Sequence, residues 1–224
     1  MGLTARAVHA HGLGLATPRG VVYAPTSLDI AQGAVTALLG PARSGRTALL
    51  LTLAGRMRPS SGSARVLGHD VVRQGARVRS LVGLGLVAGV NDLDEALTAG
   101  QHFTERALFS RGGRPLDPAD SLARAGLERA ENTRVRDMDT ASRARLGVAL
   151  GLVGDPRVLA IDDIDHDLEL AEQAAIVGLL RDIAGSGVAV FFTCVDERTA
   201  ELADAVITLP PTAPEKEVRS DAVA

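Results

Sequence analysis

The sequence is short of several residue types, and each shortage excludes a class of protein. Cys194 is the only cysteine in 224 residues, so no disulfide can form within the chain, and we expect a reducing compartment. Tryptophan is absent, and there are only one tyrosine and four phenylalanines. Lys216 is the only lysine among 24 basic residues. The net charge of −3 indicates no nucleic-acid partner, because such partners select strongly basic surfaces.

Long apolar runs are also missing. The longest, "LVGLGLVAGV" at residues 81–90, falls well short of the roughly 18 residues that a membrane-spanning helix needs. It predicts a buried strand that leads into a loop. The first residues lack the basic flank and apolar stretch of a signal peptide, so we expect none. With 46% apolar and 23% charged residues, the composition is typical of a globular domain with one large core.

What is present predicts an α/β fold. Up to about residue 35, short apolar stretches broken by Gly and Pro predict antiparallel strands. The apolar runs "AVTALL", "RVLAI" and "VAVFFTC" predict buried strands. Each is followed by a helical stretch, which is the pattern of a mainly parallel sheet.

We expect a single domain over residues 1–210 and a mobile polar tail over 211–224. Helical composition prevails between about 91 and 153, which predicts an inserted helical subdomain. Asp117 or Ser121 and Ser142 are the candidate N-caps of its helices.

The stretch "GPARSGRT" carries the clearest chemistry. It fits the phosphate-binding pattern G-x-x-x-x-G-K-[ST], with arginine in place of lysine, and lies between a predicted strand and a predicted helix. In such a loop, backbone N–H groups point at phosphate oxygens, and the hydroxyl that ends the pattern binds Mg²⁺. A guanidinium is wider and more planar than an ammonium, so Arg46 changes the shape of the loop. Taken alone, the pattern fits a strand-to-helix turn without a ligand about equally well. The candidate nucleotide-binding residues are Gly40, Pro41, Ala42, Arg43, Ser44, Gly45, Arg46 and Thr47.

Together with two longer stretches, this loop resembles the nucleotide-binding subunit of an ABC transporter, over roughly residues 3–209. The first stretch is "SLDIAQGAVTALLGPARSGRTALLLTLAGRMRPSSGSARVLGHDV" and the second is "SRARLGVALGLVGDPRVLAIDD". The resemblance implies a P-loop NTPase fold with an N-terminal antiparallel subdomain. It implies two cassettes that clamp ATP and Mg²⁺ between them. It also implies an integral membrane permease as partner, at the inner face of the cell membrane.

The same resemblance assigns the end of the second stretch to the Walker B motif. Asp162 matches the aspartate on the magnesium side, so Thr47 and Asp162 are the candidate metal ligands. The next residue should be a glutamate that polarises water. Here it is Asp163, one methylene shorter, which weakens its reach as a base. The alternative is that Asp162 and Asp163 are two surface aspartates at the end of a strand.

Other positions depart further from the family. The signature sequence falls on "MDTAS", residues 138–142, where Asp139 puts a negative charge in place of a serine. A plain N-cap for the following helix explains Asp139 at least as well. Ala88 and Gly89 stand where the family has a glutamine. Cys194 replaces the switch histidine and is expected to be inert core.

No aromatic residue precedes the loop except Tyr23, which we expect in the core, so nothing is available to stack on adenine. These departures favour a cassette that binds ATP weakly and is impaired in hydrolysis. The alternative is a slow but working ABC ATPase that energises transport. A different P-loop enzyme, such as a kinase, is disfavoured by the helical insert. The partner cassette is either a second copy or a different chain, and the transported substrate depends on the permease.

Overall fold

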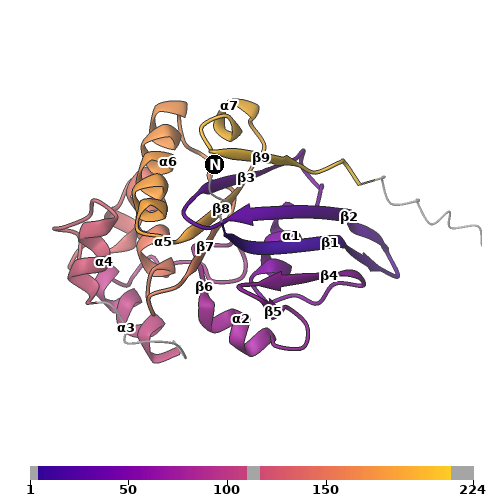
Figure 1. Ribbon diagram of the computed structural model, residues 1–224. Coiled ribbons are helices and arrows are strands. Elements are labelled where there is room, and N and C mark those ends of the chain that lie inside the picture. The colour runs from indigo at the N-terminus through magenta and orange to yellow at the C-terminus, as the bar shows by residue number, and fades with distance from the viewer. Residues whose placement is uncertain (1–4, 110–116, 213–224) are drawn as a thin grey trace, which may run out of the picture.

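The computed structural model describes residues 5–109 and 117–212, and it holds two β-sheets and a group of helices (Figure 1). The antiparallel sheet contains β1 (Arg6–Thr17), β2 (Gly20–Ala31), β4 (Ser61–Val66) and β5 (His69–Asp70). The parallel sheet contains β3 (Val35–Leu39), β6 (Val82–Leu84), β7 (Val158–Ile161), β8 (Ala189–Cys194) and β9 (Ala205–Thr208). The helices are α1 (Arg46–Leu53), α2 (Gly75–Leu81), α3 (Ala99–Phe109), α4 (Pro118–Arg124), the 3-10 turn η1 (Val135–Asp137), α5 (Thr140–Gly151), α6 (Leu170–Gly185) and α7 (Glu197–Ala200).

The parallel sheet forms the centre of the molecule. Its strands run in the order β6-β7-β8-β3-β9, and every neighbouring pair is parallel, as the apolar runs predicted. The strands β7 and β8 are buried along their whole length. Side chains alternate between faces: Phe191 packs toward the antiparallel sheet and α1, and Phe192 packs toward α6.

The antiparallel sheet covers the first of these faces. Its order is β2-β1-β4-β5, which confirms the antiparallel strands predicted at the N-terminus. Figure 1 shows this sheet on the side of the molecule away from α3 and α4, and α1 lies behind it. Tyr23 is fully buried in this core and its hydroxyl donates to Thr52 Oγ1 at 3.0 Å, so the prediction of a core tyrosine is confirmed.

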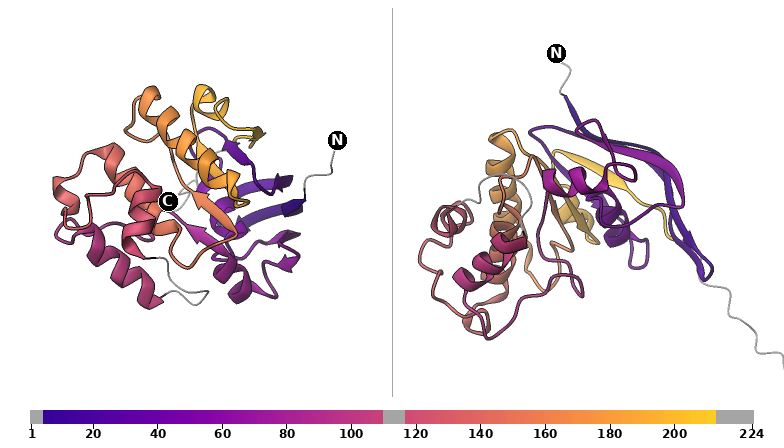
Figure 2. Two further views of the ribbon diagram at one scale, coloured as in Figure 1. Left: turned by 60° about the vertical axis from the view of Figure 1, so that its left-hand side comes forward. Right: turned by 90° about the horizontal axis from the view of Figure 1, so that it is seen from below.

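The helical group lies on the opposite side (Figures 1 and 2). A core cluster joins α3, α4 and α5, and α5 also packs against β7. Asp117 caps α4, since its Oδ1 accepts from the Ala119 N–H at 2.9 Å. The prediction of Ser142 as the N-cap of α5 is wrong. Asp139 is the cap, with its Oδ1 accepting from the Ser142 N–H at 2.7 Å.

The boundaries predicted for the domain and its helical subdomain stay predictions. Most of the predicted tail, residues 213–224, lies outside the described residues. Within the described part of the chain, no helix is both long enough and apolar enough to cross a bilayer.

Candidate nucleotide-binding site

Three neighbouring strands deliver the candidate site. β8 pairs with β3 on one side and with β7 on the other, and all three point the same way. Their carboxyl ends lead into Gly40, Asp162 and Val195, respectively for β3, β7 and β8. Ligands of open parallel sheets bind at this edge. The topology therefore brings together the two motifs, which lie more than a hundred residues apart in sequence.

The glycines of the loop are required by close packing. Gly45 has φ of 81°, and a Cβ on it would lie 2.1 Å from the carbonyl oxygen of Val22. A Cβ on Gly40 would lie 2.6 Å from Ser44 Oγ. Neither position accepts a larger residue without displacement of the loop.

The loop presents donors with nothing bound to them inside the protein. Among the described residues, the backbone N–H groups of Gly45, Arg46 and Thr47 have no acceptor, as expected for the first turn of a helix. Ser44 Oγ is buried and also has no partner there. Converging N–H groups at a helix N-terminus bind phosphate. The loop thus presents a set of donors that could hold the phosphates of a nucleotide.

The two residues predicted as metal ligands lie next to each other. Thr47 Oγ1 donates to Asp162 Oδ2 at 2.9 Å, so a hydroxyl and a carboxylate meet beside the loop. Thr193 Oγ1, at the end of β8, donates to Asp162 Oδ1 at 2.6 Å and accepts from the Asp163 N–H at 2.8 Å. Burial raises the pKa of Asp162, and the two threonine hydroxyls oppose that effect. Oxygen ligands of this kind suit Mg²⁺.

Arg46 makes contacts that bear directly on the site. It is only 8% exposed, and its Nη1 donates to the carbonyl oxygens of Gly40 and Pro41, the latter at 2.9 Å. Its Nη2 forms an ion pair with Asp163 Oδ1 at 3.0 Å. Among the described residues Arg46 Nε has no partner. The guanidinium of Arg46 is therefore bound to two carbonyls of its own loop and to the carboxylate of Asp163.

Asp163 is held in an unusual conformation. Its φ is 41°, in the left-handed region that aspartate tolerates better than most residues. The side chain is partly exposed, and one oxygen accepts from Arg46. Asp162 and Asp163 thus belong to one hydrogen-bonded network with the side chains of Thr47, Arg46 and Thr193. Two unconnected surface aspartates at a strand end would not form such a network.

Cys194 lies in the core, as expected from the sequence. It is fully buried, and burial, reinforced by the negative charge of Asp165, raises the pKa of its thiol to about 12. A thiol in that state is neither a nucleophile nor a ligand at neutral pH.

Asp139 also behaves as a structural residue, since it caps α5. The hydrogen bond from Ser142 lowers the pKa of Asp139, so the carboxylate stays charged.

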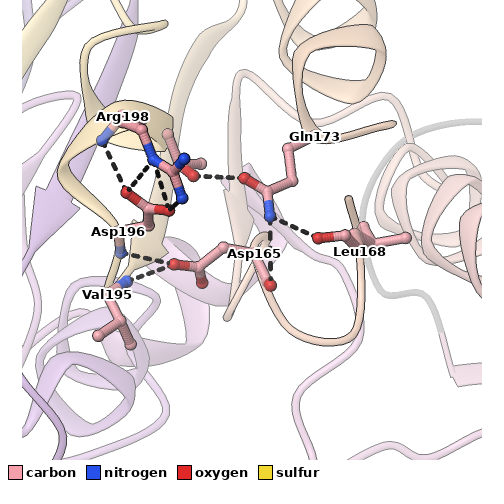
Figure 3. A network of polar contacts seen from close by, with 7 residues as sticks. Asp165, Leu168, Gln173, Val195, Asp196 and Arg198 are labelled. Carbon is pink, nitrogen blue, oxygen red and sulfur yellow. Dashed lines mark hydrogen bonds and ion pairs between the residues drawn. The ribbon is translucent and has the colours of Figure 1, made fainter. Parts of the chain in front are cut away.

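Sequence reasoning missed two residues that organise the site edge. Thr193 bridges the two Walker B aspartates, and only its place at the end of a buried strand hinted at this. Asp165 Oδ2 accepts from the backbone N–H groups of Val195 and Asp196, at 2.6 and 2.8 Å (Figure 3). The side chain of Gln173, on α6, donates to the carbonyls of Asp165 and Leu168 in the same network. The turns that follow β7 and β8 are therefore clamped together.

Comparison with known proteins agrees with this geometry. The family model described as ABC transporter matches residues 23–165. The chain belongs to the ABC transporter family. The matched range includes the phosphate loop and the aspartates Asp162 and Asp163.

Two curated relatives show the level of similarity. A daunorubicin resistance ATP-binding protein, DrrA3 of Streptomyces coeruleorubidus, is 33% identical over 186 residues, covering 80% of this chain and 57% of that protein. An uncharacterized ABC transporter ATP-binding protein of Mycobacterium tuberculosis is 30% identical over 191 residues, covering 83% of this chain and 58% of that protein. The cassette thus spans a little more than half the length of these relatives.

Solved structures share the fold. A bacterial ABC transporter cassette, MJ0796, solved as a dimer, superposes with a TM-score of 0.77 at 18% identity, covering 91% of this chain and 94% of that one. CbiO1 of Clostridium perfringens, part of the ABC transporter complex cbiONQ, has a TM-score of 0.77 at 21% identity, covering 91% and 84%. The predicted fold class, a P-loop cassette with a mainly parallel core sheet, is confirmed.

Proposed function

We propose that this chain is the ATP-binding subunit of a membrane transporter, that it binds Mg²⁺ and ATP weakly, and that it is impaired in hydrolysis. Its partners would be an integral membrane permease, at the inner face of the membrane, and a second cassette. The contact that carries the proposal is the ion pair between Arg46 and Asp163 at 3.0 Å.

Binding is supported by the donors that remain in place. The first-turn N–H groups of α1 would hold phosphate oxygens of ATP, and Thr47 and Asp162 would hold Mg²⁺, which neutralises charge on the phosphates. The weakness follows from Arg46. Its guanidinium must leave Gly40, Pro41 and Asp163, or share them, before it can contact a phosphate. Each contact given up subtracts from the affinity.

Impaired hydrolysis follows from the effect of the same ion pair on Asp163. The Arg46 guanidinium engages one oxygen of Asp163 and stabilises the carboxylate in its charged form, which makes Asp163 a weaker acceptor of a proton from water. Asp163 is also shorter than the family's glutamate, and Cys194 has no group that senses a γ-phosphate as histidine does. If a second cassette closes on this one, the charged Asp139 would face the γ-phosphate of the ATP held by that cassette, and the two negative charges would repel each other.

The second candidate, a slow but working ATPase, is favoured by one observation. Thr47, Asp162 and Thr193 form a complete hydrogen-bonded set on the magnesium side. The two functions differ in turnover and share the binding step, so turnover decides between them.

A steady-state phosphate-release assay on the purified chain, alone and with its membrane partner, tests the proposal. We expect background turnover for the natural sequence, and measurable turnover only when Arg46→Lys, Asp163→Glu, Cys194→His and Asp139→Ser are combined. Turnover of about one per second or faster by the natural sequence would establish the working ATPase instead.

Calorimetric titration with ATP and with GTP tests the binding part. We expect weak binding with little preference between the two bases, because Tyr23 is the only aromatic residue before the phosphate loop and it is buried in the core. A clear preference for ATP at low micromolar affinity would contradict the expectation that the adenine base is bound weakly.

A further inference from the structure

The side chain of Asp165 takes the place of a backbone partner at the end of β8. In the sheet, β8 is hydrogen-bonded to β3 on one side and to β7 on the other. Just beyond β7, the Ile164 N–H still donates to the Thr193 carbonyl at 3.1 Å. For Val195 and Asp196, which follow β8, the acceptor is Asp165 Oδ2, at 2.6 and 2.8 Å (Figure 3). The carboxylate thus continues the contact between the two strands past the end of β7.

One peptide connects this carboxylate to the phosphate loop. The peptide between Cys194 and Val195 contributes the N–H that donates to Asp165. The carbonyl of the same peptide, that of Cys194, accepts from the Gly40 N–H at 3.2 Å. Because a peptide is planar and rigid, fixing its N–H also fixes its carbonyl. Hydrogen bonds that follow one another in this way also polarise and strengthen each other.

Gly40 is in turn connected to the cation of the loop. Its carbonyl accepts from Arg46 Nη1, and the same guanidinium forms the ion pair with Asp163. A displacement of Gly40 would therefore also move one of the acceptors that hold Arg46. The contact of Asp165 thus bears on the ion pair from which the proposed function is argued.

The turn that carries Asp165 is held from its other side. Gln173 Nε2 donates to the carbonyls of Leu168 and Asp165, at 2.7 and 3.4 Å (Figure 3). Gln173 Oε1 accepts from Thr199 Oγ1. Gln173 is only 5% exposed and Thr199 is fully buried, so water competes little for these contacts. Asp165 therefore projects from a fixed turn, which suits a residue that positions another segment.

We propose that Asp165 is a positioning residue for the phosphate loop. It acts through the peptide between Cys194 and Val195 on the N–H of Gly40. The consequence for binding rests on the proposed function, because a loosened loop must be ordered again when it binds phosphate, and that ordering subtracts from the affinity. The positioning itself can be measured without any nucleotide.

Two uncharged variants separate the acceptor from the charge. Asp165→Asn keeps an oxygen that can accept from the two N–H groups, whereas Asp165→Ala has none. In ¹H–¹⁵N spectra of the free protein, we expect the Gly40 amide proton of Asp165→Ala to move upfield, because its hydrogen bond lengthens. Its exchange with solvent should become about tenfold faster, as for the loss of one hydrogen bond. Asp165→Asn should leave both values close to those of the natural protein.

Asp70→Ala is the matched control. Asp70 Oδ1 also accepts from two consecutive N–H groups, those of Val72 and Arg73, at 2.9 and 2.8 Å. It lies on β5 of the antiparallel sheet, so alanine there removes the same kind of contact and should leave the Gly40 amide unchanged. Two results would overturn the proposal: an equal displacement of Gly40 in Asp70→Ala, or the same Gly40 signal in Asp165→Ala as in Asp165→Asn.

Titration with ATP and Mg²⁺ measures the consequence for binding. We expect Asp165→Ala to bind about tenfold more weakly than Asp165→Asn. Both variants have lost the carboxylate charge, so repulsion of the phosphates does not distinguish them. Equal affinities in spite of a displaced Gly40 amide would contradict a positioning role in binding. If the natural chain binds no ATP, the proposed function fails, and the Gly40 amide still decides whether Asp165 positions the loop.

Hydrogen exchange of the natural protein provides a test that does not require Asp165→Ala to fold. As denaturant is added, the amides of Gly40 and Val195 should lose protection in one common opening, with the same dependence on denaturant. Exchange of Gly40 through a separate opening, while Val195 stays protected, would overturn the proposal.

Discussion

At the scale of the residue, the shape of one cation decides how the phosphate loop is used. The guanidinium of Arg46 reaches two loop carbonyls and Asp163 at once. A lysine has a single, compact nitrogen, so it cannot satisfy this fork of acceptors in the same way. Replacing the arginine therefore releases the loop and Asp163 together.

We expect Arg46→Lys to bind ATP more tightly, by about 1–3 kcal/mol, because an ammonium would contact the phosphates in the bound state. Turnover should stay near background, since Asp163 and Cys194 still fail at later steps. Calorimetry and phosphate release measure the two effects. Arg65→Lys, at an exposed position on β4 outside the loop, is the control and should bind ATP unchanged. Robust turnover by Arg46→Lys alone would show that the other departures are not disabling.

The Cys194 thiol predicts a pH dependence of stability. Its pKa rises from an ordinary value of 9.0 to about 12 on folding. Above pH 9 the unfolded chain therefore loses this proton while the folded protein keeps it, and the free energy of unfolding falls. The loss should reach about 1.4 kcal/mol at pH 10.

Denaturant titrations of the natural protein and of Cys194→Ala at pH 8 and pH 10 measure this effect. The cavity left by the alanine costs the same at both values, and every other titratable group is present in both proteins, so the difference between the proteins isolates the thiol. We expect that difference to shrink as the pH rises. A constant difference would mean that the thiol ionises as easily in the folded protein as in the unfolded chain.

At the scale of the element, the start of α5 has two roles in conflict. Asp139 caps the helix, whereas the family resemblance places a serine there to grip the γ-phosphate of a partner's ATP. Serine is also a good N-cap. A cassette can therefore exchange one role for the other at little cost in stability.

We expect Asp139→Ala to lower the free energy of unfolding by about 1 kcal/mol and Asp139→Ser to leave it nearly unchanged. Alanine has no oxygen for the Ser142 N–H, whereas serine does. Urea denaturation followed by circular dichroism measures both. Equal losses for the two variants would mean that the cap is not what Asp139 contributes.

At the scale of the whole molecule, one exposed turn is a candidate contact with the permease. Residues 88–93 follow β6, and Val90 in this turn is 54% exposed. The turn is well ordered: Asn91 Oδ1 accepts from the Val87 N–H at 2.7 Å, and its Nδ2 donates to the Gly85 carbonyl at 2.8 Å. A fixed apolar side chain on a rigid turn suits a protein contact.

We expect Val90→Asp to reduce recovery of an integral membrane protein in pull-downs from native membranes, with no change in the melting temperature. Val21→Asp, a 50% exposed valine on β2, is the matched control and should leave recovery intact. Failure of the natural chain to recover any integral membrane protein would remove the support for a transporter subunit.

Much of the fold was predictable because it depends on local patterns. Continuous apolar runs predicted β3, β7 and β8 with only small errors at their ends, because a strand buried on both faces is apolar along its length. The Gly-rich loop predicted the start of α1, because the residues that begin a helix are recognisable in the local sequence. For the N-cap of α5, local patterns offered both Asp139 and Ser142 and did not choose between them. Asp139 and Ser142 are both capping residues by type, and only the direction of the chain entering the helix decides between them.

The sequence by itself determined the family, the glycine frame of the loop and the residue types at Thr47, Asp162 and Asp163. Only the tertiary structure decided how these side chains are connected. The ion pair joins Arg46, at the start of the helix that follows β3, to Asp163, which follows β7. β8 lies between β3 and β7, and Thr193 on β8 bridges the aspartates. Such contacts depend on the order of strands in the sheet. That order arises from packing over the whole chain, so no local pattern could reveal it.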